Sequence, residues 1–348
     1  MTAIPDVSVI MANYNGARYL RPALRSLMGQ TLTSWELILV DDASGDDSVA
    51  VAEQTANGDP RVHIIRQTVN SGPAAARNRA LEAASGHWIA VFDSDDLMMP
   101  QRLQLLLQRA TSDEATIIAD NLMLFSDSKP DSKPRRYLRN RLGRSPHWVS
   151  LVEFIDSNRL YSLTPDLGYL KPMIRADIVR RLNARYDEHL RIGEDYNFLA
   201  RIMAHGHQIR LEPAAMYLYR KHPDSISHRM SAAAIHALLD ADQRFYRQAG
   251  LTHEERTALT RRRHSLESLL IYDGVISAIK DGDPGRGATM ALSEPRIWPL
   301  LTRPVTSRLK RLGQTLTCKT AARAGYPDIG GQALEDIPRL FMKDGPLL

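Results

Sequence analysis

Strand-like and helix-like segments alternate over the first 120 residues, and this alternation constrains the fold more than any other feature. Short apolar runs, which indicate buried strands, cover residues 7–11, 36–40, 62–65, 88–92 and 116–119. Helical patterns fill the intervals over 17–28, 46–55 and 73–84, and another helix opens at Pro100. Ser44 is the expected N-cap of the second helix. Alternation of this kind predicts an α/β domain with a parallel, doubly wound sheet.

Length and composition exclude several classes of protein. The 348 residues suffice for one large domain, or for one domain with a smaller second one. The single cysteine, Cys318, excludes an intramolecular disulfide and a metal site built from cysteines. No run of 18 apolar residues is present to span a bilayer. Residues 1–9 lack the basic start of a signal peptide, which predicts a cytoplasmic chain.

Charge is divided unevenly along the chain. Residues 1–130 hold 10 Lys/Arg and 16 Asp/Glu, a net of −6, whereas residues 131–348 hold 35 and 24, a net of +11. The acidic first part and an aromatic content of 6% argue against a nucleic-acid partner. The basic second part suits phosphates, an anionic lipid surface or a charged glycan. Its densest basic run comprises Lys133, Arg135, Arg136, Arg139, Arg141 and Arg144. A solvated surface is the other interpretation of that run.

Polar residues follow the predicted strands, where ligands of such sheets bind. These residues are Ala12, Asn13, Tyr14 and Asn15 after the first strand, Asp41 and Asp42 after the second, and Asp93, Ser94, Asp95 and Asp96 after the fourth. Five carboxylates at one edge repel each other unless a cation or hydrogen-bond donors neutralise them. Oxygen ligands at Asp93 and Asp95 suit Mg²⁺ or Mn²⁺. An acidic turn in which Asp96 caps a helix is the alternative.

Two other segments offer chemistry. Asp42 either accepts the N3–H of a uracil ring or caps a helix. Residues 70–78 place Gly72 at a helix N-terminus and Arg77 one turn further on, where it would meet a diphosphate. The absence of Gly-x-Gly-x-x-Gly and of a Walker A lysine disfavours dinucleotide dehydrogenases and P-loop enzymes.

Two downstream segments leave their roles open. Glu194 and Asp195 are either a pair that caps a helix or, for Asp195, a general base. His222 is a metal ligand, a diphosphate contact or an ordinary loop histidine.

Five motifs occur in one order, at residues 7–15, 40–44, 72–78, 92–96 and 193–196. Together they resemble the family 2 inverting glycosyltransferases of the GT-A fold, over roughly residues 7–227. The resemblance implies a nucleotide-diphospho-sugar donor, a divalent cation (Mg²⁺ or Mn²⁺) and inversion at the anomeric carbon. It implies that Asp195 is the base, supported by Glu194, and that Asp95 is the main metal ligand, with His222 as a further one. The implied donor-binding residues are Ala12, Tyr14, Asn15, Asp42, Arg77 and Asp93. One departure is Arg79, where family members often carry glycine.

Residues 120–122, 168–173 and 190–196, followed by helical patterns over 231–248 and 254–280, narrow the resemblance. They are similar to exopolysaccharide glucosyltransferases of the succinoglycan type. This implies a GT-A domain over 1–230 and a helical extension over 231–348 for membrane or acceptor docking or for homodimerisation. It also implies transfer of glucose from UDP-glucose to an oligosaccharide on a polyprenyl diphosphate, through a β-bond, at the inner face of a membrane.

Two other functions remain as alternatives. A sugar-phosphate nucleotidyltransferase would need a basic, glycine-rich phosphate loop near the N-terminus, which residues 12–16 do not supply. A non-catalytic scaffold with a nucleotide-sugar pocket would not need the full set of acids at the sheet edge.

Overall fold

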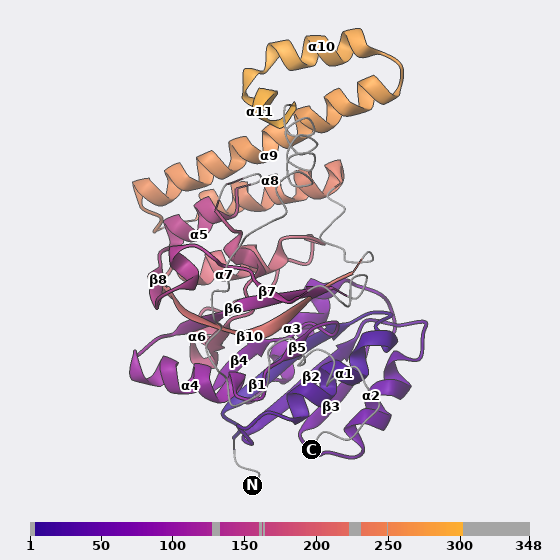
Figure 1. The fold of residues 1–348 in the computed structure, drawn as a ribbon, viewed down its shortest axis with the longest axis vertical. Helices are drawn as coiled ribbons and strands as arrows, with labels where there is room; N and C mark the ends of the chain where they lie inside the picture. The colour runs from indigo at the N-terminus through magenta and orange to yellow at the C-terminus, as the bar shows by residue number, and fades with distance from the viewer. Residues whose placement is uncertain are drawn as a thin grey trace, which may run out of the picture.

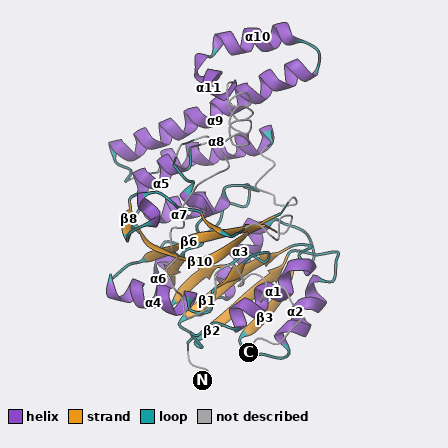
Figure 2. Cartoon of the chain, in the orientation of Figure 1, coloured by secondary structure: helices purple, strands orange, loops and turns teal. Residues whose placement is uncertain are grey.

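A computed structural model describes residues 4–126, 133–159, 162, 164–222, 231–248 and 250–301. It places a mixed sheet with helices on both faces at one end and a stack of helices at the other (Figures 1 and 2). The α/β class and the helical C-terminal region are as the sequence predicts. The end of the predicted extension, residues 302–348 with Cys318, lies outside the described residues.

The sheet has ten strands. Its order is β3 (Val62–Arg66), β2 (Trp35–Asp41), β1 (Val7–Asn13), β4 (Trp88–Val91), β9 (Met173–Arg175), β6 (Ile117–Ser126), β10 (Ile209–Lys221) and β5 (Leu97–Met98). Two short strands join outside this order, β7 (Arg135–Arg136) on β6 and β8 (His147–Val149) on β10. The first four strands are parallel, as predicted, but β9 runs antiparallel to both β4 and β6. The sheet is therefore mixed rather than wholly parallel.

The helices of the first half are α1 (Ala17–Met28), α2 (Ser48–Ala56), α3 (Pro73–Ala83) and α4 (Arg102–Ser112). The chain steps outward from β1 to β2 and β3, and then returns to β4 on the other side of β1. Because such crossovers are right-handed, α1 and α2 cover one face of the sheet and α3 covers the other. The reversal of strand order at β1 and β4 is the position where ligands bind in sheets of this type.

The predicted N-cap of α2 is wrong. Asp47, and not Ser44, precedes the helix, and no side chain caps it. Ser44 instead donates a hydrogen bond to Asp41 at 2.6 Å and accepts one from the backbone N–H of Asn15 at 2.9 Å. Ser44 therefore links the ends of β1 and β2.

The second half contributes the helices α5 (Leu151–Ser157), α6 (Ala176–Arg181) and α7 (Glu194–Met203), with short 3-10 turns η1 (Arg141–Gly143) and η2 (Leu167–Tyr169). The two predicted C-terminal helices are present as α8 (Ala232–Tyr246) and α9 (His253–Lys280). They are followed by α10 (Pro284–Ser293), η4 (Pro295–Ile297) and α11 (Trp298–Leu301). α9 packs against α5, α8 and α10. In the described parts of the chain, no helix has both the length and the hydropathy needed to cross a membrane.

The C-terminal helices are attached to the segment that carries Asp195. A separate apolar cluster consists of Leu190, Ile235, Leu238, Ala241 and Leu266. A buried ion pair joins Arg262 of α9 to Asp242 of α8, and the Arg262 guanidinium lies 3.9 Å from the ring centroid of Tyr196 in α7. α8 and α9 therefore brace the N-terminal turn of α7.

Candidate active site

The donor-binding residues predicted after β1 lie at the carboxyl edge of the sheet. Asn13 Nδ2 donates to Asp41 Oδ1 at 2.9 Å, which ties the ends of β1 and β2 together. Asn15 has a left-handed backbone (φ 51°), and its Oδ1 accepts from the Gly45 N–H at 2.8 Å. Ala12 is half-buried, whereas the Tyr14 ring is exposed. This segment is thus fixed by hydrogen bonds and presents an aromatic ring to solvent.

Asp42 is buried and holds the loop before α3. Its Oδ1 accepts from Gln67 Nε2 at 2.9 Å and from the Ser71 N–H at 2.8 Å, and its Oδ2 accepts from the Gly72 N–H at 2.7 Å. Gly72 has φ 94°, a backbone conformation that requires glycine, and a Cβ there would also displace the side chain of Arg191, whose Nη1 would lie 2.4 Å away. A carboxylate has about four acceptor positions. Three of these positions on Asp42 are filled within the chain, and acceptance of the N3–H of uracil stays a prediction.

Three acids and two cations from distant segments meet beside this loop. Arg77 of α3 lies 2.9 Å from Asp93, 2.7 Å from Glu194 and 3.3 Å from Asp195. Lys171 Nζ lies 2.7 Å from Asp93 Oδ2 and 2.9 Å from Asp195 Oδ2. The predicted donor-side acid Asp93 and the predicted base Asp195 are therefore bridged by a single ammonium group. We call these five residues the site network.

Burial and charge act against each other within the site network. Burial raises the pKa of Asp93, but Lys171 and Arg77 outweigh it and lower that pKa to about 2. Burial and the neighbouring Asp195 raise the pKa of Glu194, although Arg77 opposes them. Burial acts to lower the pKa of Lys171 and Arg77, but the acids outweigh it and raise both well above the ordinary values, so both cations stay charged. With three carboxyl groups and two charged cations, the site network has one acidic group more than it has cations.

The Arg77 side chain is already occupied by contacts within the protein. Its guanidinium is buried and pairs with three carboxylates, so in this structure Arg77 holds acidic side chains in place. Contact with a diphosphate stays a prediction. Arg79, two residues further along α3, is exposed and pairs with Glu82.

The acids after β4 fit a divalent cation. Oxygens of Asp93, Asp95 and Asp96 lie within 4.8 Å of one another. Burial and the charges of Asp95 and Asp93 raise the pKa of Asp96 well above its ordinary value, a cost that a bound cation would relieve. His222 Nε2 lies 2.9 Å from Asp95 Oδ2, about the separation of adjacent ligands around Mg²⁺ or Mn²⁺. Within the described residues, its buried Nδ1 has no hydrogen-bond partner. This donor set of oxygens with one imidazole suits Mn²⁺ or Mg²⁺.

Comparison with known proteins identifies the family. The profile described as "Glycosyl transferase family 2" matches residues 8–182. The chain is 34% identical over 310 residues to succinoglycan biosynthesis protein ExoO of Rhizobium meliloti, covering 89% of this chain and 87% of that protein. This chain is a family 2 glycosyltransferase. The predicted resemblance to succinoglycan biosynthesis proteins is confirmed as well.

Solved structures support the fold of this glycosyltransferase. S. aureus TarS 1–349 in complex with UDP-GlcNAc aligns with a TM-score of 0.58 at 18% identity, covering 77% of this chain and 71% of that one. Mannosyltransferase PcManGT from Pyrobaculum calidifontis, in complex with GDP-Man and Mn²⁺, aligns with a TM-score of 0.56 at 18% identity, covering 89% and 88%. The predicted GT-A fold is thereby confirmed.

Sequence reasoning missed two parts of the site of this glycosyltransferase. Lys171 lies between η2 and β9. The only indication of it in the sequence was its place before Pro172 in the motif at residues 168–173. Below it, Arg102 of α4 pairs with Asp120 of β6 at 2.8 Å and also donates to the Lys171 carbonyl. The Arg102 guanidinium lies 4.8 Å from the ring centroid of Tyr217, whose hydroxyl accepts from the Asp93 N–H. A fully buried pair thus supports the site network from beneath.

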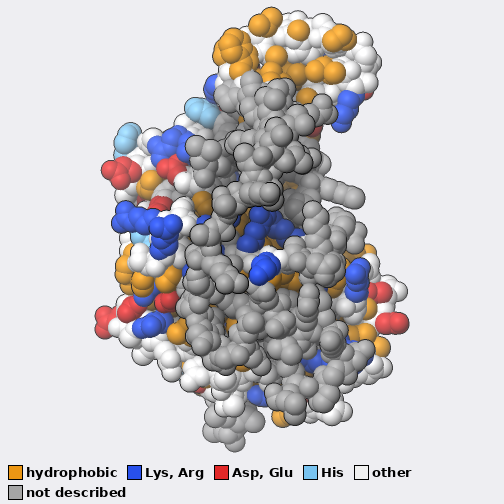
Figure 3. All heavy atoms as spheres, in the orientation of Figure 1, with side chains coloured by type: hydrophobic (Ala, Val, Ile, Leu, Met, Phe, Trp, Pro, Cys, Tyr) orange, Lys and Arg blue, Asp and Glu red, His pale blue; other side chains and the backbone are white. Residues whose placement is uncertain are grey.

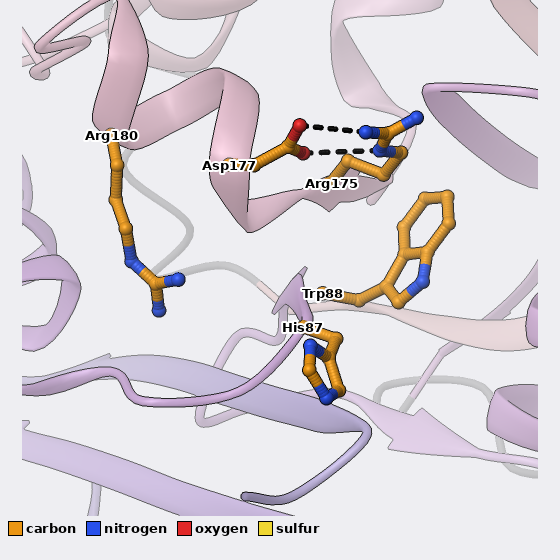
Figure 4. Close-up of a pocket in the computed structure, with 5 residues that line it drawn as sticks. All are labelled: His87, Trp88, Arg175, Asp177 and Arg180. Atoms are coloured by element: carbon orange, nitrogen blue, oxygen red, sulfur yellow. Dashed lines mark hydrogen bonds and ion pairs between the residues drawn. The ribbon is translucent and has the colours of Figure 1, made fainter.

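A pocket of about 320 Å³ lies at the opposite end of β4 (Figure 4). It is lined by His87, Trp88, Arg175, Asp177 and Arg180. Arg175 and Asp177 form a two-hydrogen-bond pair on one side, and Arg180 donates to the carbonyls of Ala84 and Gly86 on the other. Its charged groups therefore have partners within the chain, and none of the predicted site residues lines it.

Proposed function

We propose that this chain is a metal-dependent inverting glycosyltransferase of exopolysaccharide synthesis. It moves a sugar, with glucose as the first candidate, from a UDP-sugar to an oligosaccharide on a polyprenyl diphosphate and forms a β-glycosidic bond. Family membership and the likeness to ExoO support the reaction class and the pathway. The observation that carries the mechanism is the bridge of Lys171 between Asp93 and Asp195, because it brings the donor side and the base together.

In the proposed mechanism Asp195 accepts the proton of an acceptor hydroxyl as that oxygen attacks the sugar. Attack from the face opposite UDP inverts the anomeric carbon in one displacement, so no enzyme nucleophile is needed. Lys171 and Arg77 hold the Asp195 carboxylate in place, and Arg77 also holds Glu194. A base fixed in this way loses little entropy on reaching the reacting geometry.

Donor binding is assigned to the carboxyl edge of the sheet. Asp42 accepts from the uracil N3–H, the exposed Tyr14 ring packs on the base, and Ala12 and Asn15 contact the nucleoside. Asp95, with Asp93 and His222, would hold Mg²⁺ or Mn²⁺. When bound, that cation stabilises the charge that develops on the leaving UDP.

The end of the molecule formed by α10, α11 and the end of α9, which we call the helical tip, suits binding to the surface of a membrane. The side chains of Ile279, Leu292 and Trp298 are 52%, 71% and 50% exposed. Apolar side chains gather over α10 at the end of the molecule farthest from the sheet (Figure 3). Together with the net charge of +11 over residues 131–348, this supports peripheral binding at the inner face of an anionic membrane. The alternative is that the same helical tip forms the interface of a homodimer.

The test is release of UDP from a panel of UDP-sugars with Mn²⁺, with and without lipid extract as acceptor. We expect metal-dependent release, fastest with UDP-glucose, and a product whose anomeric proton shows the large coupling of a β-glucoside in NMR. An α-linked product would overturn inversion. Absence of release with every donor would overturn the proposed function.

A variant of Asp95 tests the metal site separately from the sugar-transfer reaction. Asp95→Ala should lose metal-dependent binding of UDP in calorimetry while it keeps the thermal stability of the wild type. Glu53→Ala, which removes an exposed carboxylate of α2, is the control and should bind as the wild type does. Retained metal-dependent binding in Asp95→Ala would remove Asp95 from the metal site.

The two alternatives make different predictions in the same assay. A nucleotidyltransferase would consume UTP and a sugar phosphate and release inorganic diphosphate. A scaffold would bind the UDP-sugar without releasing UDP. The family match supports neither alternative.

A further inference from the structure

Two cations lie near the carboxyl ends of β6 and β10: Arg135 of β7, which pairs beside the end of β6, and Lys221, the last residue of β10. Leu124 of β6 pairs with Arg135 of β7 on one side and with Tyr219 of β10 on the other. Directly paired residues share a face, and alternate residues of a strand share a face. Arg135, Tyr219 and Lys221 therefore lie on the same face.

Three tyrosines connect these cations with the site network. The ring centroids of Tyr169 and Tyr219 are 6.1 Å apart, and those of Tyr137 and Tyr169 are also 6.1 Å apart, both edge to face. Tyr169 comes two residues before Lys171, whose ammonium contacts Asp195. Tyr217, two residues before Tyr219, accepts from the Asp93 N–H at 3.1 Å. Tyr169 is thus two residues from the lysine that contacts Asp195, and Tyr219 is two residues from the tyrosine that contacts the Asp93 N–H.

The two cations have no anionic partner in the described part of the chain, and both are exposed. Arg135 lies opposite Leu124 of β6, and Lys221 lies two residues beyond Tyr219, the partner of Leu124 on the other side, so the two positive charges lie near each other on this face. Arg139, Arg141 and Arg144 follow without an acidic residue among them. Such a surface is relieved by binding an anion.

We propose that Arg135 and Lys221 bind the diphosphate of a prenyl-linked acceptor, with the rings of Tyr169 and Tyr219 against the acceptor sugar. This assignment rests on the proposed function and gives its acceptor a site. Arginine and lysine side chains match phosphate oxygens in charge and in hydrogen bonding. From Tyr217 to Lys221 the strand rises roughly 13 Å. The diphosphate would therefore lie close to the reacting hydroxyl, which favours a short acceptor over a long one.

Binding of the diphosphate is tested without metal or activity, in EDTA, with farnesyl diphosphate as the probe. We expect the double variant Arg135→Gln/Lys221→Gln to bind at least tenfold more weakly than the wild type at low salt. The matched control is Arg66→Gln/Arg175→Gln, which removes two exposed arginines elsewhere on the sheet and should bind as the wild type does. Equal binding by wild type and Arg135→Gln/Lys221→Gln, or no binding by the wild type, would overturn the proposal.

The sugar contact has its own measurement. Farnesyl diphosphate that carries glucose should bind the wild type more tightly than farnesyl diphosphate alone. Tyr219→Leu should remove that difference and leave the affinity for farnesyl diphosphate within about twofold. If the wild type shows no preference, or if Tyr219→Leu keeps it, the role of the tyrosines is overturned.

Two more measurements distinguish a diphosphate site from a membrane-binding surface and from the catalytic centre. If Arg135→Gln/Lys221→Gln weakens binding to phosphatidylglycerol vesicles as much as to farnesyl diphosphate, the surface recognises a membrane and the diphosphate assignment is overturned. Sugar transfer by a wild type that does not bind farnesyl diphosphate would overturn this inference alone. Binding of farnesyl diphosphate by a wild type that turns over no sugar nucleotide would support the anion site and overturn the proposed function.

Discussion

Two buried clusters of charge lie next to each other in this glycosyltransferase, and they differ in composition. The Arg102–Asp120 pair has one cation and one anion, both fully buried, and further hydrogen bonds join it to the Lys171 carbonyl and the Met216 N–H. The site network has two cations and three carboxylates, and its acids are 12–22% exposed at the sheet edge. The closed pair has no unused charge, whereas the open network has an excess carboxylate that can take up a proton. We therefore expect the pair to determine stability and the site network to determine turnover.

The largest effect should follow from Asp195→Asn. The amide keeps the size of the side chain but cannot take the proton, so sugar transfer should fall by about 10²–10⁴-fold. Metal-dependent UDP binding in calorimetry should stay within a factor of a few. Transfer is measured as UDP release, with the melting temperature as the control for folding. Near-normal turnover would remove Asp195 from its role as base.

The closed pair should respond in stability. Arg102→Met leaves Asp120 charged and unpaired in the interior, which should cost about 3–5 kcal/mol of unfolding free energy. Urea denaturation at pH 7 measures this loss. Arg102→Met/Asp120→Leu should recover most of it, because an apolar pair replaces an ion pair at little cost. A double variant as unstable as the single one would show that the stability comes from the hydrogen bonds to the Lys171 carbonyl and the Met216 N–H rather than from the ion pair.

Lys171→Met tests whether the open network acts on turnover. We expect kcat to fall by about 10–100-fold, because the base loses a positioning contact, and the donor KM to change less, because Arg77 still holds Asp93. Lys171→Arg should restore part of kcat. Adding Lys171→Met to Asp195→Asn should cause little further loss, since the lysine would act through that carboxylate. Additive losses would show that Lys171 has a separate role.

The sequence predicted the first half of the fold well and the site only in part. The five predicted strands and the first helices have clear periods, and they appear at nearly the predicted positions. β9 has three residues, too few for a period, and its antiparallel insertion between β4 and β6 is a tertiary choice that no local pattern encodes. β10 contains Pro213, and its pairing with β6 shifts register between Glu212 and Ala215.

The contacts of the site depend on the same tertiary choices. The sequence indicated Asp93 and Asp195 because acids after a strand or at a helix start carry a recognisable pattern. It could not indicate the bridge by Lys171, because that lysine reaches Asp195 only when β9 is paired between β4 and β6. Asp42 shows the same limit, since its three donors belong to a loop 25–30 residues away.

The smallest effect concerns a carboxylate that belongs to neither cluster. In the described part of the chain Asp166 has no ion-pair partner, and burial raises its pKa to about 6, against the opposing Gly168 N–H and Arg262. A folded-state pKa above the unfolded value of 3.8 means that folding takes up a proton between those values. The destabilising contribution of Asp166 should therefore shrink as the pH falls from 7 to 4.

Asp166→Asn, which keeps the size of the side chain, should add about 2 kcal/mol to the unfolding free energy at pH 7.5 and almost nothing at pH 4. Urea denaturation at both pH values measures this. Asp177→Asn is the matched control, because Arg175 lowers the pKa of that exposed acid and the sign should not be positive. A gain of the same size at both pH values would mean that the amide improves packing or capping. A gain confined to neutral pH would show that a buried acid costs stability unless a cation accompanies it, as Arg102 accompanies Asp120.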